Sequence, residues 1–178
     1  DFIIRAVFAH QELLSTMEKN LYALTEQLGA SLQQAGHCLV TAESCTGGGV
    51  AKLCTEIAGS SAWFDSGFVV YSNTSKQHLL SVKQQTIEQY GAVSEAVVLE
   101  MAKGALKQSS AQVALAVSGI AGPGGGSAYK PVGTVCIACV IEDQAEWVQT
   151  FYFQGDRVRV REQAIFESIT SLLALLTK

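Results

Sequence analysis

The sequence predicts an α/β protein, a three-layer α/β/α sandwich in which helices cover both faces of one sheet. Short apolar segments typical of strands alternate with longer amphipathic segments typical of helices. Several strand segments are continuous apolar runs, as expected when both faces of a sheet are covered. The last two have no helix between them and should pair antiparallel, so we expect a mixed, mostly parallel sheet of about five to six strands.

Composition sets the domain organisation and argues against several partners. The chain has 178 residues, 48% of them hydrophobic, which is enough for one substantial core but not for two. We expect a single domain over residues 15–178, after a lead-in over residues 1–14 that lacks the features of a signal peptide and lies outside the ordered domain. A formal net charge of -4 offers no basic field for nucleic acid, and no apolar run is long enough for a membrane span.

The N-terminal half is predicted to contain two strands and three helices. Leucines three and four residues apart indicate a first amphipathic helix, which ends at Gly36. Thr46 is a candidate N-cap for the second helix, and Asn73 and its two successors can cap the third. In order, we expect a helix over residues 15–36, a strand over 38–43, a helix over 46–57, a strand over 64–72 and a helix from about 73 onward.

The C-terminal half is predicted to contain three strands and two helices. Ser94 and Glu95 can open the first of these helices, whose apolar stripe includes Met101. In order, we expect a helix over residues 93–109, a strand over 112–118, a glycine-rich loop over 119–133, strands over 134–141 and 146–153, and a final helix over 157–176.

Five cysteines, an odd number in a chain too large to need disulfides, indicate reduced thiols and a cytoplasmic location. Cys136 and Cys139 have the spacing of a redox pair. They lie in an apolar strand, however, where residues three apart face opposite sides. Redox pairs normally lie at a helix N-terminus, so we interpret both thiols as buried packing groups.

Three polar segments directly follow predicted strands: ESCTGGG, YSNTSK and SGIAGPGGG. Ligands of open α/β sheets bind beyond the carboxyl ends of the strands, so we expect these segments to line one crevice. In the first segment, Ser44 lies at a strand-to-helix turn, and the glycines at 47–49 leave backbone N–H groups free at a helix start. Such a turn can bind a phosphate or an oxyanion, although these residue types are more often simple helix caps and packing contacts.

The second segment adds Tyr71 at a strand end and Lys76 in the next turn. A lysine that loses solvent beside a serine can act as its base, and a tyrosine can relay or hold the proton. A half-buried tyrosine and a solvated lysine are the more ordinary interpretations. Cys45 is a rival nucleophile at the first turn. The three histidines show no metal-ligand spacing, so neither a Ser-His-Asp triad nor a zinc site is expected.

The third segment, residues 119–126, can bring bare backbone close to a ligand, and its alternative interpretation is a flexible surface loop. Further on, GDRVRVR places arginines at positions 157, 159 and 161 of a helix start, where the helix dipole disfavours cations. An anionic ligand would explain this placement, and so would a surface pair with Asp156 or Glu162.

Taken together and in order, the motifs TAESCTGG, VVYSNTSK, YGAVSE, SGIAGPGGG, KPVGTV and GDR resemble the CinA C-terminal domain family, whose stand-alone members include nicotinamide mononucleotide deamidases. The resemblance runs from about Thr16 to the C-terminus, and the string of motifs is more specific than any one of them. It implies an amidohydrolase that converts nicotinamide mononucleotide and water into nicotinic acid mononucleotide and ammonia in pyridine nucleotide recycling.

The resemblance also implies the site. Ser44 is the expected nucleophile, with Tyr71 and Lys76 as its catalytic partners, and Arg157 and the glycine loop are the candidates for the substrate phosphate. No metal or organic cofactor is implied, and a cytoplasmic homodimer is expected. The expected substrate-binding residues are Glu43, Cys45, Thr46, Gly47, Gly48, Asn73, Ser118, Gly119, Gly122, Gly124, Gly125 and Arg157.

Two alternatives stay open at this point. A catalytically silent nucleotide-binding or regulatory domain would keep the fold and the pocket without turnover, and the family contains such members. A thiol redox protein using Cys136 and Cys139 would need thiols that exchange at neutral pH, which burial in a strand opposes. Ammonia release from nicotinamide mononucleotide separates the first alternative from the enzyme.

Overall fold

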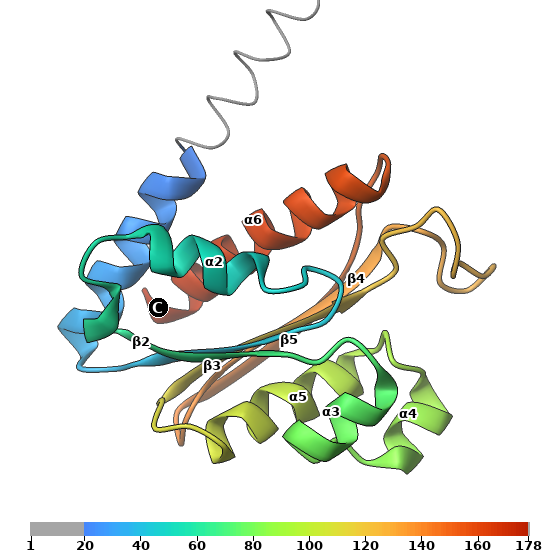
Figure 1. Cartoon of the computed structure of the whole chain (residues 1–178), viewed down its shortest axis with the longest axis horizontal. Helices are drawn as coiled ribbons and strands as arrows, with labels where there is room; N and C mark the ends of the chain where they lie inside the picture. Colours follow the sequence, from blue (N-terminus) through green and yellow to red (C-terminus); the bar gives the residue numbers. More distant parts are fainter. Residues whose placement is uncertain (1–19, 178) are drawn as a thin grey trace, which may run out of the picture.

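The computed structural model describes residues 20–177, which form a five-stranded sheet with helices on both faces (Figure 1). The strands are β1 (Leu39–Glu43), β2 (Phe64–Val69), β3 (Val113–Gly119), β4 (Thr134–Ile141) and β5 (Ala145–Tyr152), in the order β2-β1-β3-β4-β5. β2, β1 and β3 are parallel neighbours, whereas β4 is antiparallel to both β3 and β5. All strands except β4 therefore point the same way, and the predicted mixed sheet is confirmed.

The helices divide between two layers, which confirms the predicted sandwich. The helix over residues 20–35, α2 (Gly49–Glu56) and α6 (Arg157–Leu176) cover one face (Figure 1). The other face carries α3 (Asn73–Leu80), α4 (Gln84–Tyr90) and α5 (Glu95–Lys107). The sequence pattern does not predict α4 or the 3₁₀ turn η1 (Ser60–Ala62), because each is too short to show an apolar period. The predicted lead-in, residues 1–14, lies outside the described residues.

The two faces of the sheet carry side chains of different size. Leu39, Leu115 and Ile137 are among the large residues that face α2, α6 and the helix over residues 20–35. The opposite face is made largely of small side chains, so α5 packs closely on it: Ala42, Ala114, Ala116 and Ala138. Because β3 and β4 are covered on both faces, their sequences are the continuous apolar runs that predicted a sandwich.

Cys136 and Cys139 face opposite sides of β4, as predicted. Cys139 packs with the large side chains and Cys136 with the small ones, and both thiols are free and buried. Burial raises the pKa of both thiols. A protonated thiol is a poor nucleophile, so the pair is suited to packing rather than to thiol exchange.

Two predicted helix caps are wrong by a few residues. Thr46 does not cap α2, which begins at Gly49 after Gly48 in the left-handed conformation, at φ 92°. The Thr46 hydroxyl instead donates a hydrogen bond to Glu43. For α3, the cap is Ser72, whose hydroxyl oxygen accepts the N–H of residue 75, rather than Asn73 or its successors. The predicted start of α5 at Ser94 and the predicted bounds of α6 are confirmed.

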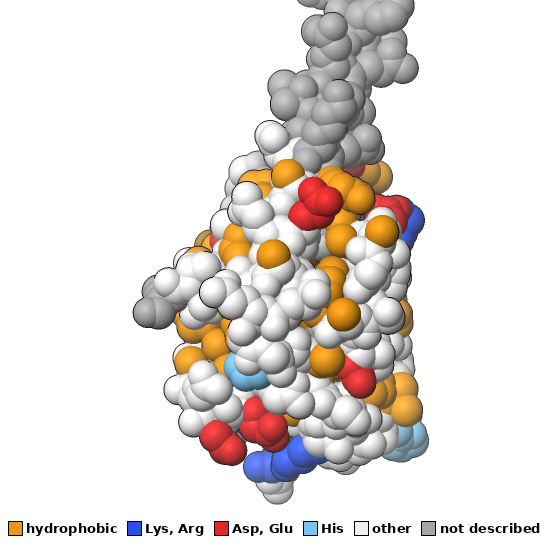
Figure 2. All heavy atoms as spheres, turned by 90° about the vertical axis from the view of Figure 1, so that its left-hand side faces the viewer, with side chains coloured by type: hydrophobic (Ala, Val, Ile, Leu, Met, Phe, Trp, Pro, Cys, Tyr) orange, Lys and Arg blue, Asp and Glu red, His pale blue; other side chains and the backbone are white. Residues whose placement is uncertain are grey.

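The surface adds two observations. Among the described residues, no helix is both long enough and apolar enough to span a bilayer. On the face at the left of Figure 1, Lys and Arg side chains are few and lie close to acidic ones (Figure 2). That face therefore shows no extended basic patch of the kind that binds a phosphate backbone.

Candidate active site

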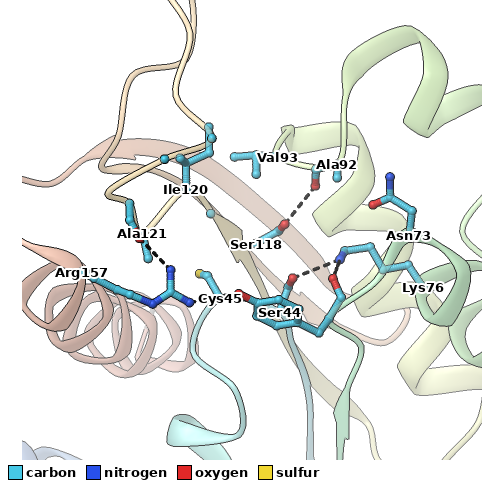
Figure 3. Close-up of a pocket in the computed structure, with 15 residues that line it drawn as sticks. Ser44, Cys45, Asn73, Lys76, Ala92, Val93, Ser118, Ile120, Ala121 and Arg157 are labelled. Atoms are coloured by element: carbon cyan, nitrogen blue, oxygen red, sulfur yellow. Dashed lines mark hydrogen bonds between the residues drawn. The ribbon is translucent and has the colours of Figure 1, made fainter.

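The carboxyl ends of β1, β2 and β3 meet at one edge of the sheet, where the three polar segments form a cavity of about 250 Å³. The start of α6 closes it from the side (Figure 3). The predicted shared crevice is thus confirmed. Its predicted members that line the cavity are Ser44, Cys45, Tyr71, Asn73, Lys76, Ser118, Gly119, Gly122, Gly124, Gly125 and Arg157.

Lys76 is buried, with only 1% of its surface exposed, and its ammonium nitrogen contacts Ser44. Nζ lies 3.0 Å from Ser44 Oγ (Figure 3), 3.0 Å from the Val70 carbonyl oxygen and 2.9 Å from that of Tyr71. Carbonyl oxygens only accept, so each holds one N–H of the lysine. Besides its carbon and these two N–H groups, the nitrogen has one more tetrahedral position, which faces Ser44. In the neutral amine this position holds the lone pair.

Burial shifts the protonation equilibrium of Lys76 toward that neutral amine. Burial lowers the pKa of Lys76 below the ordinary lysine value, because desolvation disfavours the charged form. No salt bridge within residues 20–177 involves its ammonium to offset this effect. The interpretation of Lys76 as a solvated helix residue is therefore wrong, and the structure shows a buried Ser44–Lys76 pair instead.

Ser44 and Cys45 differ in their suitability as nucleophiles. The Ser44 backbone N–H donates to the Val117 carbonyl at 3.0 Å, which fixes the residue to the end of β3, and its hydroxyl faces Lys76. The Cys45 thiol packs against Gly119, and burial raises its pKa to about 12. A thiol that stays protonated at neutral pH is a weak nucleophile, so the geometry favours the serine.

Glu43 does not line the cavity, although it directly precedes Ser44. Its carboxylate is fully buried and turns back toward the first turn of α2. It accepts the Thr46 hydroxyl at 2.7 Å and the backbone N–H groups of Val50 and Ala51, each at 2.9 Å. An internal anion therefore occupies the N-terminus of α2, where the sequence suggested that a ligand could bind.

Two of the three glycines of this turn do not offer free N–H groups either. The N–H groups of Gly47 and Gly49 donate to the carbonyls of Ser44 and Thr46, at 3.1 Å each. Gly47, Gly48 and Thr46 join Glu43 as the expected binding residues that do not line the cavity. Gly47 and Gly48 have positive φ values of 61° and 92°, so their role is to let the chain turn sharply between β1 and α2.

Arg157 is a cationic side chain that lines the cavity mouth. Its guanidinium (Figure 3) donates to the Gly122 carbonyl at 2.8 Å and to the Tyr71 hydroxyl at 3.0 Å, and thereby joins α6, the glycine loop and the end of β2. The tyrosine is 61% exposed and stands at the cavity mouth. Arg159, two residues further along α6, pairs with Glu162 on the surface at 3.3 Å, which is one of the alternatives that the sequence predicted for these arginines.

One wall of the cavity was not predicted from the sequence. It consists of Ala92 and Val93, which precede α5, whereas Ile120 and Ala121, which also line the cavity, belong to the predicted segment SGIAGPGGG. Small apolar residues in loops carry no chemical signal. The only sequence hint is that the YGAVSE motif lies between a helix and a capping serine.

Side chains from β3 and the glycine loop hold this wall in place. The Ser118 hydroxyl donates to the Ala92 carbonyl at 2.9 Å, and Lys130 Nζ donates to the carbonyl of Val93 at 2.7 Å and to that of Tyr90. Ser118 is therefore a cavity residue whose hydroxyl is already used by the protein. The described residues contain no group of three His, Cys, Asp or Glu side chains arranged to hold a metal ion.

The chain is similar to proteins of one family. Residues 21–176 match the family described as CinA C-terminal domain. The chain is 54% identical over 156 residues to nicotinamide-nucleotide amidohydrolase PncC of Enterobacter agglomerans, covering 88% of this chain and 95% of that protein. It is 50% identical over 155 residues to the protein of the same name from Escherichia coli K12, covering 87% of this chain and 94% of that one.

The fold is also similar to solved structures. The crystal structure of the competence/damage inducible protein CihA from Agrobacterium tumefaciens matches with a TM-score of 0.85 and 42% sequence identity. The match covers 89% of this chain and 96% of that one.

Proposed function

Because the chain belongs to the CinA C-terminal domain family, we propose that it hydrolyses the carboxamide of nicotinamide mononucleotide at Ser44. The products are nicotinic acid mononucleotide and ammonia. The observation that carries the proposal is the contact of 3.0 Å between Ser44 Oγ and the buried Lys76 amine, at the cavity formed by the family motifs. The similar proteins named amidohydrolases support the reaction and the substrate class.

Lys76 moves the proton in both halves of the reaction. As a neutral amine it accepts the Ser44 proton while the hydroxyl oxygen attacks the carboxamide carbon. The resulting ammonium then donates that proton to the departing nitrogen, which leaves as ammonia and gives an acyl-serine. Water, deprotonated by the regenerated amine, attacks the acyl carbon and releases nicotinic acid mononucleotide and free Ser44. Each proton that Lys76 accepts is returned, so no net charge builds up in the buried pair.

Tyr71 and Arg157 assist at the cavity mouth. Arg157 donates to the tyrosine oxygen, which leaves the tyrosine O–H free to donate toward the substrate. Arg157 is also suited to the phosphate, since a guanidinium binds phosphate with paired N–H groups. The apolar wall of Ala92 and Val93 is suited to the pyridine ring. We expect Arg157→Ala to raise KM for the mononucleotide far more than for the dephosphorylated riboside, and equal effects would assign Arg157 a structural role.

The test is ammonia release from nicotinamide mononucleotide by the pure protein. Ser44→Ala should lower kcat by several orders of magnitude, roughly the loss seen for other serine nucleophiles, while substrate binding persists. Cys45→Ala is the matched control and should lower kcat much less. Wild-type protein that binds the nucleotide without releasing ammonia would identify a silent binding domain. Activity lost in Cys45→Ala but kept in Ser44→Ala would move the nucleophile to the thiol.

We further propose that the protein acts in the cytoplasm as a homodimer. Five free cysteines, four of them buried, support a reducing compartment. The exposed apolar side chains Val69 and Val158 support self-association. Light scattering during size-exclusion chromatography measures the mass directly, and a monomer at micromolar concentration would contradict the dimer.

A further inference from the structure

Arg161 lies one turn beyond Arg157 on α6, but it serves a different part of the molecule. Its Nε donates to the Cys45 carbonyl at 3.0 Å, and its Nη2 donates to the Thr46 carbonyl at 3.2 Å. It does not line the cavity. The guanidinium therefore holds the turn that carries Ser44, residues 44–48, from the side of α6.

This turn needs such support because its own sequence makes it flexible. Gly47 and Gly48 adopt positive φ values of 61° and 92°, and glycines leave the backbone free to adopt other conformations. Glu43 fixes one side of the turn through Thr46 and the start of α2. Arg161 fixes the carbonyl groups of the two residues after the nucleophile, Cys45 and Thr46.

The direction of those carbonyls matters for the chemistry. A peptide group is planar and trans, so a carbonyl that points to Arg161 directs the N–H of the same peptide the opposite way. Attack of Ser44 on a carboxamide creates a negatively charged oxygen, and a carbonyl oxygen turned toward it would oppose that charge. Arg161 keeps the oxygens of Cys45 and Thr46 bound on the α6 side.

We propose that Arg161 is a positioning residue for the reaction, which sets the conformation of the nucleophile turn without touching the substrate. This inference rests on the proposed function for its kinetic consequence. It also has a consequence that does not depend on the substrate. The amides of residues 44–50 should exchange with solvent more slowly in the wild-type protein than in a variant without Arg161.

Arg159 provides a matched control on the same helix. It is the same residue type, its guanidinium pairs with Glu162 on the surface, and it makes no hydrogen bond to residues 44–48. Arg159→Ala removes an equal volume and charge, so effects of net charge and of helix composition appear equally in both variants.

The experiment compares Arg161→Ala, Arg161→Lys and Arg159→Ala for kcat, KM, hydrogen exchange of residues 44–50 and rescue by added guanidinium ion. Arg161→Ala should lower kcat roughly a hundredfold with KM within about threefold, as expected for a displaced reacting group. Arg161→Lys, with one compact ammonium, should fall between it and the wild type. Guanidinium, at concentrations well below those that unfold proteins, should restore part of kcat in Arg161→Ala only.

The outcomes separate this inference from the proposed function. A wild type without ammonia release would reject the proposed reaction, and hydrogen exchange of the turn would still decide the role of Arg161. Equal exchange and equal kcat in Arg161→Ala and Arg159→Ala would overturn the inference. A loss of kcat in Arg161→Ala that guanidinium does not restore, with unchanged exchange of the turn, would also overturn it.

Discussion

Two glycine-rich segments form the cavity, and they are held in different ways. In the nucleophile turn, Glu43 and the three residues after it are all buried, and charged side chains fix the turn from both sides. In the glycine loop, residues 119–133, the tip is exposed, and 93% of the surface of Tyr129 is accessible. Glycine content is similar in the two segments, so composition alone does not determine how each one is held. The charged side chains that contact each segment do.

The glycine loop is attached to the molecule near its two ends. Arg157 holds the Gly122 carbonyl at one end, and Lys130 holds the wall formed by residues 90–93 at the other. We therefore expect changes in the nucleophile turn to act mainly on kcat and stability, and changes in the glycine loop to act mainly on KM. The following predictions test this division, beginning with the largest effect.

Lys76→Arg should be as inactive as Lys76→Ala, with kcat lower by about four orders of magnitude. The guanidinium keeps the positive charge but does not deprotonate, so it cannot accept the Ser44 proton. Both variants are assayed for ammonia release. Substantial activity in Lys76→Arg would make the lysine an electrostatic group and leave Tyr71 as the candidate base.

The same lysine should determine the acid side of the pH profile. Because burial lowers the folded pKa of Lys76 below 10.5, the amine is neutral over a wider pH range than a solvated lysine would be. The value of kcat/KM should fall as pH drops below this lowered pKa, since the protonated form is not a base. A profile that stays flat down to the pH range where carboxylates titrate would contradict a lysine base.

Glu43→Gln should lower the free energy of unfolding by about 3 kcal/mol, and kcat should fall with it. In the wild-type protein, several donors share the Glu43 carboxylate. The glutamine amide replaces one of its oxygens with an N–H₂ group, which cannot accept, so at least one buried donor loses its acceptor. Urea unfolding measures the change. Glu56→Gln, which removes an exposed pair with Lys52 at the other end of α2, is the control and should change stability by less than about 1 kcal/mol. Equal losses of unfolding free energy in the two variants would contradict a special role for Glu43 in holding the start of α2.

Lys130→Met should raise KM about tenfold while kcat stays within about threefold, because the wall loses support but the Ser–Lys pair does not. The carbonyls of Tyr90 and Val93 lose their shared donor. Steady-state kinetics on ammonia release gives both constants. Lys103→Met, which removes an exposed pair with Glu146, should leave both unchanged. A fall in kcat with constant KM would place Lys130 with the nucleophile turn instead.

Gly122→Ala and Gly124→Ala should differ, although both lie in the glycine loop. Gly122 has φ of 84°, and a Cβ there would lie 2.5 Å from a Val132 methyl group, so the substitution should cost about 1–2 kcal/mol of stability and raise KM. A Cβ at Gly124 would meet nothing within 4 Å, so Gly124→Ala should be close to wild type. Thermal unfolding and KM are compared for both. Equal behaviour would mean that the loop has no fixed conformation near Gly122.

The sequence predicts the layered fold and the three polar segments because these depend on local patterns. Apolar runs in β3 and β4 reflect burial on both sides, and periodic apolar residues define α6 over its full length. The position of polar segments after parallel strands is enough to place Ser44 and Lys76 in one crevice. The cap of α2 is missed, since the path of the chain after β1 depends on Glu43 turning back toward the helix.

The sequence by itself determined the fold class, the crevice and the residues able to react, because each follows from residue types at short spacing along the chain. Tertiary structure alone decided which of these residues are charged, buried or held. Burial lowers the pKa of Lys76, two backbone carbonyls fix the position of its nitrogen beside Ser44, and three similar arginines are divided among the cavity, the surface and the nucleophile turn. Such roles depend on contacts between residues far apart in the chain, whose distances and desolvation no local pattern records.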